Sequence, residues 1–76
     1  MMNTNALQRW NNDLNAMAKE TVTVAAVGNM LYAFGSELAI LRIFATYQSR
    51  GAVHNPRVRM SYNPSATSWV LALNTE

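Results

Sequence analysis

The chain has 76 residues, of which 50% are hydrophobic and only 13% are charged, with a formal net charge of +2 and no cysteine. A chain of this length forms one domain at most, so residues 1–76 are treated as a single small domain. The lack of cysteine excludes disulfides, thiolate metal sites and cysteine nucleophiles, and it favours a reducing, cytoplasmic setting. With so few charges to cover its surface, the monomer should expose apolar area, which is typical of interaction proteins.

The first predicted element is a helix over residues 6–19. Its apolar side chains recur at spacings of three, four and three, which defines one helical face: Leu7, Trp10, Leu14 and Met17. Thr4 or Asn5 is expected to cap its first turn. The opposite side is rich in asparagine, a poor helix former, so this helix should depend on docking its apolar face.

Residues 21–24 fit two structures. They are β-branched and alternate in polarity, which suits a short strand, but they also precede the longest helical pattern in the chain. We favour a turn in which Thr21 or Thr23 caps the next helix, with a strand as the alternative.

Residues 24–49 predict a long amphipathic helix. Apolar side chains recur at alternating spacings of four and three along the segment, and Leu38 and Leu41 are assigned to the core. Gly51 follows as the helix stop. One continuous helix would be about 40 Å long, whereas a domain of this size has a radius of gyration of about 11 Å.

Two arrangements resolve that mismatch. The helix breaks at Gly35-Ser36, with Ser36 as a new N-cap and Glu37 in the first turn, or it stays whole and buries its overhang against a second subunit.

The tail, residues 57–73, predicts a β-hairpin that turns at Asn63-Pro64. Pairing Asn63 with Ser68 places six apolar side chains on one face, as Val58 opposite Leu73, Met60 opposite Leu71 and Tyr62 opposite Trp69. The other face then carries Arg57, Arg59, Ser61, Val70 and Ala72. The hairpin should pack on the long helix, which makes the predicted fold class α+β.

Catalytic chemistry is not expected. The single histidine, His54, has no acidic residue nearby in sequence, and the four carboxylates are scattered. No metal spacing, phosphate loop or nucleophile elbow is present, so we expect no cofactor and no enzymatic activity.

The leading functional hypothesis is a protein-interaction module. Trp10 is the first candidate anchor for a partner, and Tyr32, on the small-residue side of the long helix, is the second. Gly28, Gly35 and Ala39 on that side would permit close helix approach, so a homodimer is also expected. In size and lack of cysteine, the chain has the profile of a small phage or mobile-element accessory protein, which favours an inhibitory binder that occludes or remodels its target.

The alternative hypothesis is an arginine-based nucleic-acid or anion site. Its candidate residues are Arg50, His54, Arg57 and Arg59, which gather in the basic half of the sequence. Ordinary helix capping and solvation of the hairpin also account for these residues. A membrane span is not expected, because Asn29, Glu37 and Arg42 interrupt the longest apolar segment, and the N-terminus lacks the features of a signal peptide.

Overall fold

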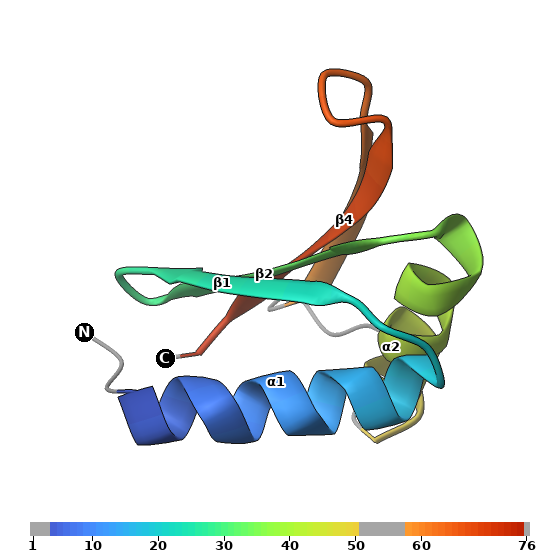
Figure 1. Ribbon diagram of the computed structural model, residues 1–76. Coiled ribbons are helices and arrows are strands. Elements are labelled where there is room, and N and C mark those ends of the chain that lie inside the picture. Colours follow the sequence, from blue (N-terminus) through green and yellow to red (C-terminus); the bar gives the residue numbers. More distant parts are fainter. Residues whose placement is uncertain (1–3, 51–57, 76) are drawn as a thin grey trace.

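Two helices cover one face of a four-stranded antiparallel sheet in the computed structural model, which describes residues 4–50 and 58–75 (Figure 1). Six elements follow in order: α1 (Thr4–Ala18), β1 (Thr23–Val27), β2 (Met30–Gly35), α2 (Glu37–Arg50), β3 (Val58–Asn63) and β4 (Ser68–Asn74). The strand order is β1-β2-β4-β3, so β2 and β4 are central and β1 and β3 are the edges. The predicted α+β class is confirmed.

Helix α1 forms where its apolar face predicts it. Leu14 and Ala18 are fully buried, and Leu7, Trp10 and Met17 pack partly buried against the core. The helix begins at Thr4, so Thr4 and Asn5 lie in its first turn and do not cap it. Lys19 ends it with a φ of 58°.

Two side chains tie the end of α1 to the rest of the molecule. The side-chain oxygen of Asn15 accepts the Val22 amide at 2.7 Å, which fixes the start of the chain that leads into β1. From the other helix, the Arg42 guanidinium donates to the Ala18 carbonyl at 3.1 Å. A cation at a helix C-terminus satisfies a free carbonyl and complements the helix dipole.

The long helix predicted for residues 24–49 is wrong over its first half. Residues 23–35 form the β1–β2 hairpin, whose two-residue turn is Gly28-Asn29. Gly28 takes a φ of 58°, the left-handed conformation that the first position of such a turn requires. Thr23 and Val24 therefore lie in strand β1. The favoured prediction, in which Thr21 or Thr23 caps a helix, is wrong, and the alternative of a strand is correct. The largest extent of the structure is 31 Å, shorter than the rejected helix.

Of the two arrangements, the one in which a helix starts after Ser36 is confirmed, although a strand and not a helix precedes it. The Ser36 hydroxyl accepts the Ala39 amide at 3.1 Å, as an N-cap does, and Glu37 opens the first turn of α2. A Cβ on Gly35 would lie 2.9 Å from the Val22 Cγ1 atom, so the strand end needs glycine to fit beside Val22.

The assignment of Leu38 and Leu41 to the core is wrong. They are 53% and 45% exposed, because α2 turns Ala39, Ile40 and Ile43 toward the sheet instead. The orientation of α2 about its own axis is set by its packing on the sheet, and the apolar pattern of the longer predicted helix did not predict it. Neither described helix is long and apolar enough to cross a membrane.

The C-terminal hairpin has the predicted register in every pair, from Val58 with Leu73 to Asn63 with Ser68. The Asn63 side chain accepts the Ser65 amide at 3.1 Å, which stabilises the turn. The hairpin also packs differently from the prediction, because β4 pairs with β2 along its length as well as lying over α2. Its tip projects beyond the helices (Figure 1).

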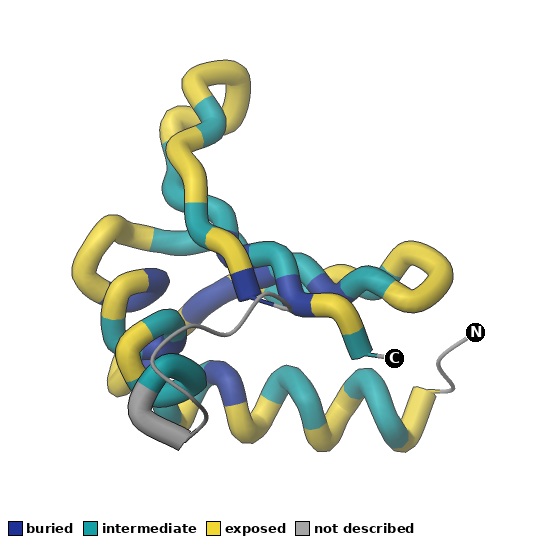
Figure 2. The backbone as a smooth tube through the Cα atoms, turned by 180° about the vertical axis from the view of Figure 1, so that it is seen from behind, coloured by how far each residue is buried: buried dark blue, intermediate teal, exposed yellow. Residues whose placement is uncertain are grey.

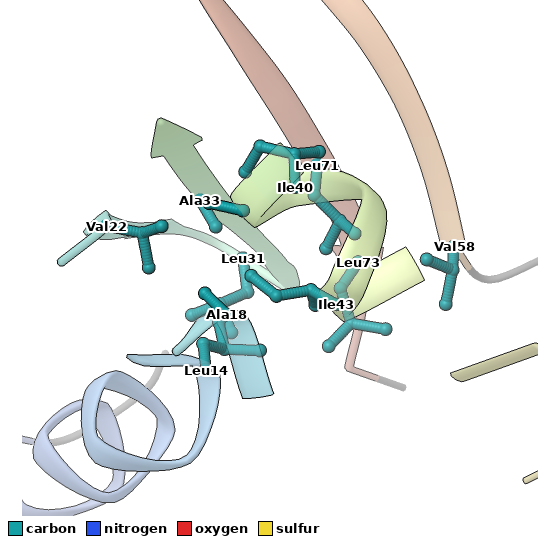
Figure 3. Packing of buried hydrophobic residues seen from close by; sticks show 11 residues of the cluster. Leu14, Ala18, Val22, Leu31, Ala33, Ile40, Ile43, Val58, Leu71 and Leu73 are labelled. Atoms are coloured by element: carbon teal, nitrogen blue, oxygen red, sulfur yellow. The ribbon is translucent and has the colours of Figure 1, made fainter. Parts of the chain in front are cut away.

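The core is entirely apolar among the described residues. Its buried members are Leu14, Ala18, Val22, Leu31, Ala33, Ala39, Ile40, Ile43, Val58, Leu71 and Leu73. Figure 3 shows Leu31 of β2 at the centre, between the side chains of α1 and those of α2 and β4. Both helices therefore depend on the same face of one central strand.

Replacing Ser36 with alanine should lower the free energy of unfolding by about 1 kcal/mol, because the first turn of α2 loses its cap. Urea unfolding followed by circular dichroism measures the change. The control is Ser61→Ala, at an exposed position of β3, which should change stability by less than about 0.5 kcal/mol. Equal effects of the two substitutions would contradict a capping role.

Candidate binding surface on the open sheet face

The sheet has one covered face and one open face. Side chains alternate along each strand, and the register gives eleven strand residues one common side, which faces the helices. They are Val24, Ala26, Leu31, Ala33, Gly35, Val58, Met60, Tyr62, Trp69, Leu71 and Leu73. The other thirteen residues form what we call the open face: Thr23, Ala25, Val27, Met30, Tyr32, Phe34, Arg59, Ser61, Asn63, Ser68, Val70, Ala72 and Asn74. Both helices lie on the opposite side, and no other described element covers this one (Figures 1 and 2).

The open face is apolar in the middle and along most of the β1 edge, and it is polar along the β3 edge and at its outer ends. One row across the strands reads Ala25, Tyr32, Ala72 and Arg59, and the next reads Thr23, Phe34, Val70 and Ser61. Seven of its thirteen members are apolar, and Val27 is 67% exposed. Arg59 is its one charged member. An apolar, aromatic centre with a polar rim and few charges is the composition of a protein interface.

Tyr32 and Phe34 form the centre of the open face. They lie two residues apart on β2, so both rings project to the same side, with their centroids 6.4 Å apart and their planes inclined by 32°. The half-buried rings leave part of their faces to solvent. Rigid aromatic side chains offer a large contact area at small entropic cost, which makes them common anchors for partners.

A shallow groove of about 390 Å³ runs from these two rings to the tip of the β3–β4 hairpin. Its lining residues are Tyr32, Phe34, Ser61, Tyr62, Asn63, Pro64 and Val70. Tyr62 also borders the groove near the tip, although the register places it with Trp69 on the other face of the hairpin. It is 50% exposed and meets Trp69 edge to face at a centroid distance of 5.6 Å. The groove is open to solvent and too shallow to enclose a small ligand, so it suits a larger partner that lies across it.

The two predicted protein anchors lie on different faces. Tyr32 is on the open face, exposed by a strand and not by the helix that was predicted to carry it. Trp10 is on α1, half-buried against the core, in the layer on the other side of the sheet. One flat partner surface therefore does not contact both.

The small-residue surface predicted for self-association does not exist. Gly28 lies in the β1–β2 turn, Gly35 ends β2, and Ala39 is fully buried in α2. These residues shared one side only on the helix that residues 24–35 do not form. A dimer through that surface is therefore excluded.

Only one member of the predicted anion site is placed with its side chain. Arg59 is exposed on β3 and projects from the open face, as the hairpin register predicted. Arg50 ends α2, and its side chain is outside the described part of the structure, as are His54 and Arg57 altogether. Within the described ranges, no three acidic, histidine or cysteine side chains gather where they could hold a metal ion.

Phe34 is the site residue that the sequence analysis missed, because residues 24–49 were predicted to form one helix and not a strand with two alternating faces. Gly28-Asn29 between two β-branched or aromatic segments was the signal that could have placed it, since such a pair is typical of a tight hairpin. With the hairpin recognised, alternation along residues 30–35 separates Leu31 and Ala33 from Tyr32 and Phe34.

Comparison with protein families, with curated proteins and with solved structures finds no match to this chain.

Trp10→Ala tests whether this side chain stabilises the fold or is available to a partner. Because the indole packs half-buried on the core, its loss should lower the free energy of unfolding by about 2 kcal/mol, roughly half the cost of truncating a fully buried aromatic. Arg9→Ala, at the exposed neighbouring position, is the control and should be close to neutral in urea unfolding. An unchanged midpoint for Trp10→Ala would return Trp10 to the list of partner anchors.

Proposed function

We propose that this protein is a non-catalytic interaction module that binds a protein partner through the open face of its sheet and modulates that partner. The observation that carries the proposal is the uncovered apolar centre around Tyr32 and Phe34, which has polar side chains and a single charge along its β3 side. A chain with so few charged residues spreads most of them over the helices and loops, so this face is poorly solvated in the free monomer.

The size of the open face fits a specific but modest contact. Four strands at a spacing of about 4.8 Å and about six residues at about 3.4 Å give a face of about 19 Å by about 20 Å, or about 400 Å². Apolar patches of this size on small proteins are often functional. A standard interface takes about 800 Å² from each partner, so one copy of the face supports a weak or transient complex.

A module of this kind acts on its partner through binding alone. Nothing in the proposal requires the chain to make or break a covalent bond, so its effect on the partner would come from occluding a surface or holding it in one conformation. Inhibition is the simplest effect of this kind.

Phe34→Thr tests the proposal, because threonine keeps the β-propensity of the strand and removes the ring. We expect at least about a tenfold loss of affinity for a protein captured by the tagged chain from its native lysate, as for the loss of a central aromatic anchor. The partner is first identified by mass spectrometry after nuclease treatment, and its affinity is then measured by titration calorimetry.

The matched control is Leu38→Ala, which removes exposed apolar area from α2 on the other layer of the molecule. It should leave the affinity unchanged. If Leu38→Ala abolishes binding and Phe34→Thr does not, the partner binds the helical layer and the proposal for the open face is wrong.

Single-stranded nucleic acid is the second candidate partner, and one observation favours it. Arg59, Ala72 and Tyr32 lie in one row across three strands, so a cation and an aromatic ring share an open antiparallel sheet that carries no acidic side chain. Aromatic rings on open sheets stack bases, and arginine pairs with phosphate.

Tyr32→Leu and Arg59→Ala distinguish the two candidates. If the partner is a single strand, fluorescence anisotropy with a labelled oligonucleotide should show about a tenfold loss for Tyr32→Leu, since stacking contributes about 1–3 kcal/mol per base. Arg59→Ala should reduce the slope of affinity against salt by about 0.7. Wild-type protein that does not bind the oligonucleotide at low salt removes this candidate.

A further inference from the structure

Strand β1 is an unprotected edge. It pairs with β2 through five consecutive residues without a bulge, and its other side has no strand neighbour among the described residues. The sixteen residues from Thr21 to Ser36 contain no charge and no proline. Natural sheets protect their edges with charges, prolines or bulges, and the opposite edge β3 does carry Arg59. An edge that is regular, uncharged and β-branched is a template for another strand.

Hydrogen bonding identifies which backbone groups of β1 are free. The Thr75 amide donates to the Asn29 carbonyl at 2.9 Å, so the groups of Met30 turn the other way, toward β1. Val27, the register partner of Met30, therefore points its N–H and C=O at β2, and the alternate residues Ala25 and Thr23 do the same.

The residues between them point outward. Val24 and Ala26 thus present two N–H and two C=O groups at the outer edge, where no strand of the described residues pairs with them. The side chains of both residues pack against the core, so it is their backbone that lies along the outer edge.

This pattern is complementary to itself. If two copies of β1 run antiparallel about a twofold axis through Ala25, Val24 of each copy lies opposite Ala26 of the other. Each such pair exchanges two N–H···O bonds, which satisfies all the free groups of both edges. Ala25 then faces its own copy, where a methyl group fits the close spacing of a non-hydrogen-bonded pair. Strand β1 itself contributes no charge to this contact.

We propose that two copies of the chain pair through β1 and join their sheets into one eight-stranded antiparallel sheet. The twofold axis is perpendicular to the sheet, so the contact closes after two copies and does not propagate. The two open faces then lie on the same side and form one surface of about 800 Å², the area that a standard interface takes from each partner. The pairing of the two copies does not depend on the proposed function. The use of the enlarged surface for binding a partner does rest on that function.

A charge exchange at Ala25 tests the pairing, because this exposed residue meets only its own copy. Ala25→Lys and Ala25→Glu should each weaken dimerisation by at least about fivefold in sedimentation equilibrium, since like charges then lie directly opposite each other. An equimolar mixture of the two variants should restore the dimer. The control Ser61→Lys adds the same charge at an exposed position of the other edge and should leave the dimer unchanged.

Amide hydrogen exchange is a second measurement, and it distinguishes pairing of the copies from a general change in folding stability. In the dimer the Val24 and Ala26 amides should exchange more slowly as protein concentration rises, whereas the Thr23, Ala25 and Val27 amides, already bonded to β2, should not respond.

Three results would overturn the pairing: a wild-type chain that stays monomeric at millimolar concentration, a mixture that does not restore the dimer, or Val24 and Ala26 amides whose exchange ignores concentration. Phe34→Thr separates this proposal from the previous one. It should weaken partner binding at least about tenfold and leave the dimer intact, so the failure of either proposal is visible without the other.

Discussion

The pairing of β2 with β4 is the contact on which the rest of the structure depends. It joins two hairpins from opposite halves of the chain into one sheet, and it places both strands in the centre. Because side chains alternate, this one register determines two surfaces at once. Leu31 and Ala33 meet β4 residues on the core face, while Tyr32 and Phe34 meet Ala72 and Val70 on the open face. It also leaves β1 at the edge, where no other strand of the described residues lies on its outer side.

The two helices cover one face of the sheet and leave its other face uncovered by any described element. The core forms where α1 and α2 meet Leu31, and Arg42 and Asn15 hold the helical layer to the chain around it. The described charges other than Arg59 lie on the helices and the loops beside them. The open face therefore carries a single charge and β1 carries none. These are the two surfaces that the two proposals concern.

Prediction from sequence succeeded where a local signal and a tertiary requirement agreed. The C-terminal hairpin has a turn signal at Asn63-Pro64 and one strongly apolar face, so only one register satisfies both. Ser36 is a good N-cap directly before a helical pattern, and it caps α2. Prediction failed over residues 24–35, where alanine, valine and leucine fit both the helical and the strand periodicity. The turn at Gly28-Asn29 decides between them in favour of two strands.

The sequence by itself determined the α+β class, helix α1, the start of α2 and the register of the last hairpin, because each depends on caps, turns and periodicities within a short segment. Only the tertiary structure decided that Tyr32 and Phe34 share an open face with Arg59. That neighbourhood requires β2 to pair with β4, a contact between distant segments whose pairing no local pattern specifies. The same holds for the exposure of Leu38 and Leu41, since the rotation of α2 is set by the sheet on which it packs.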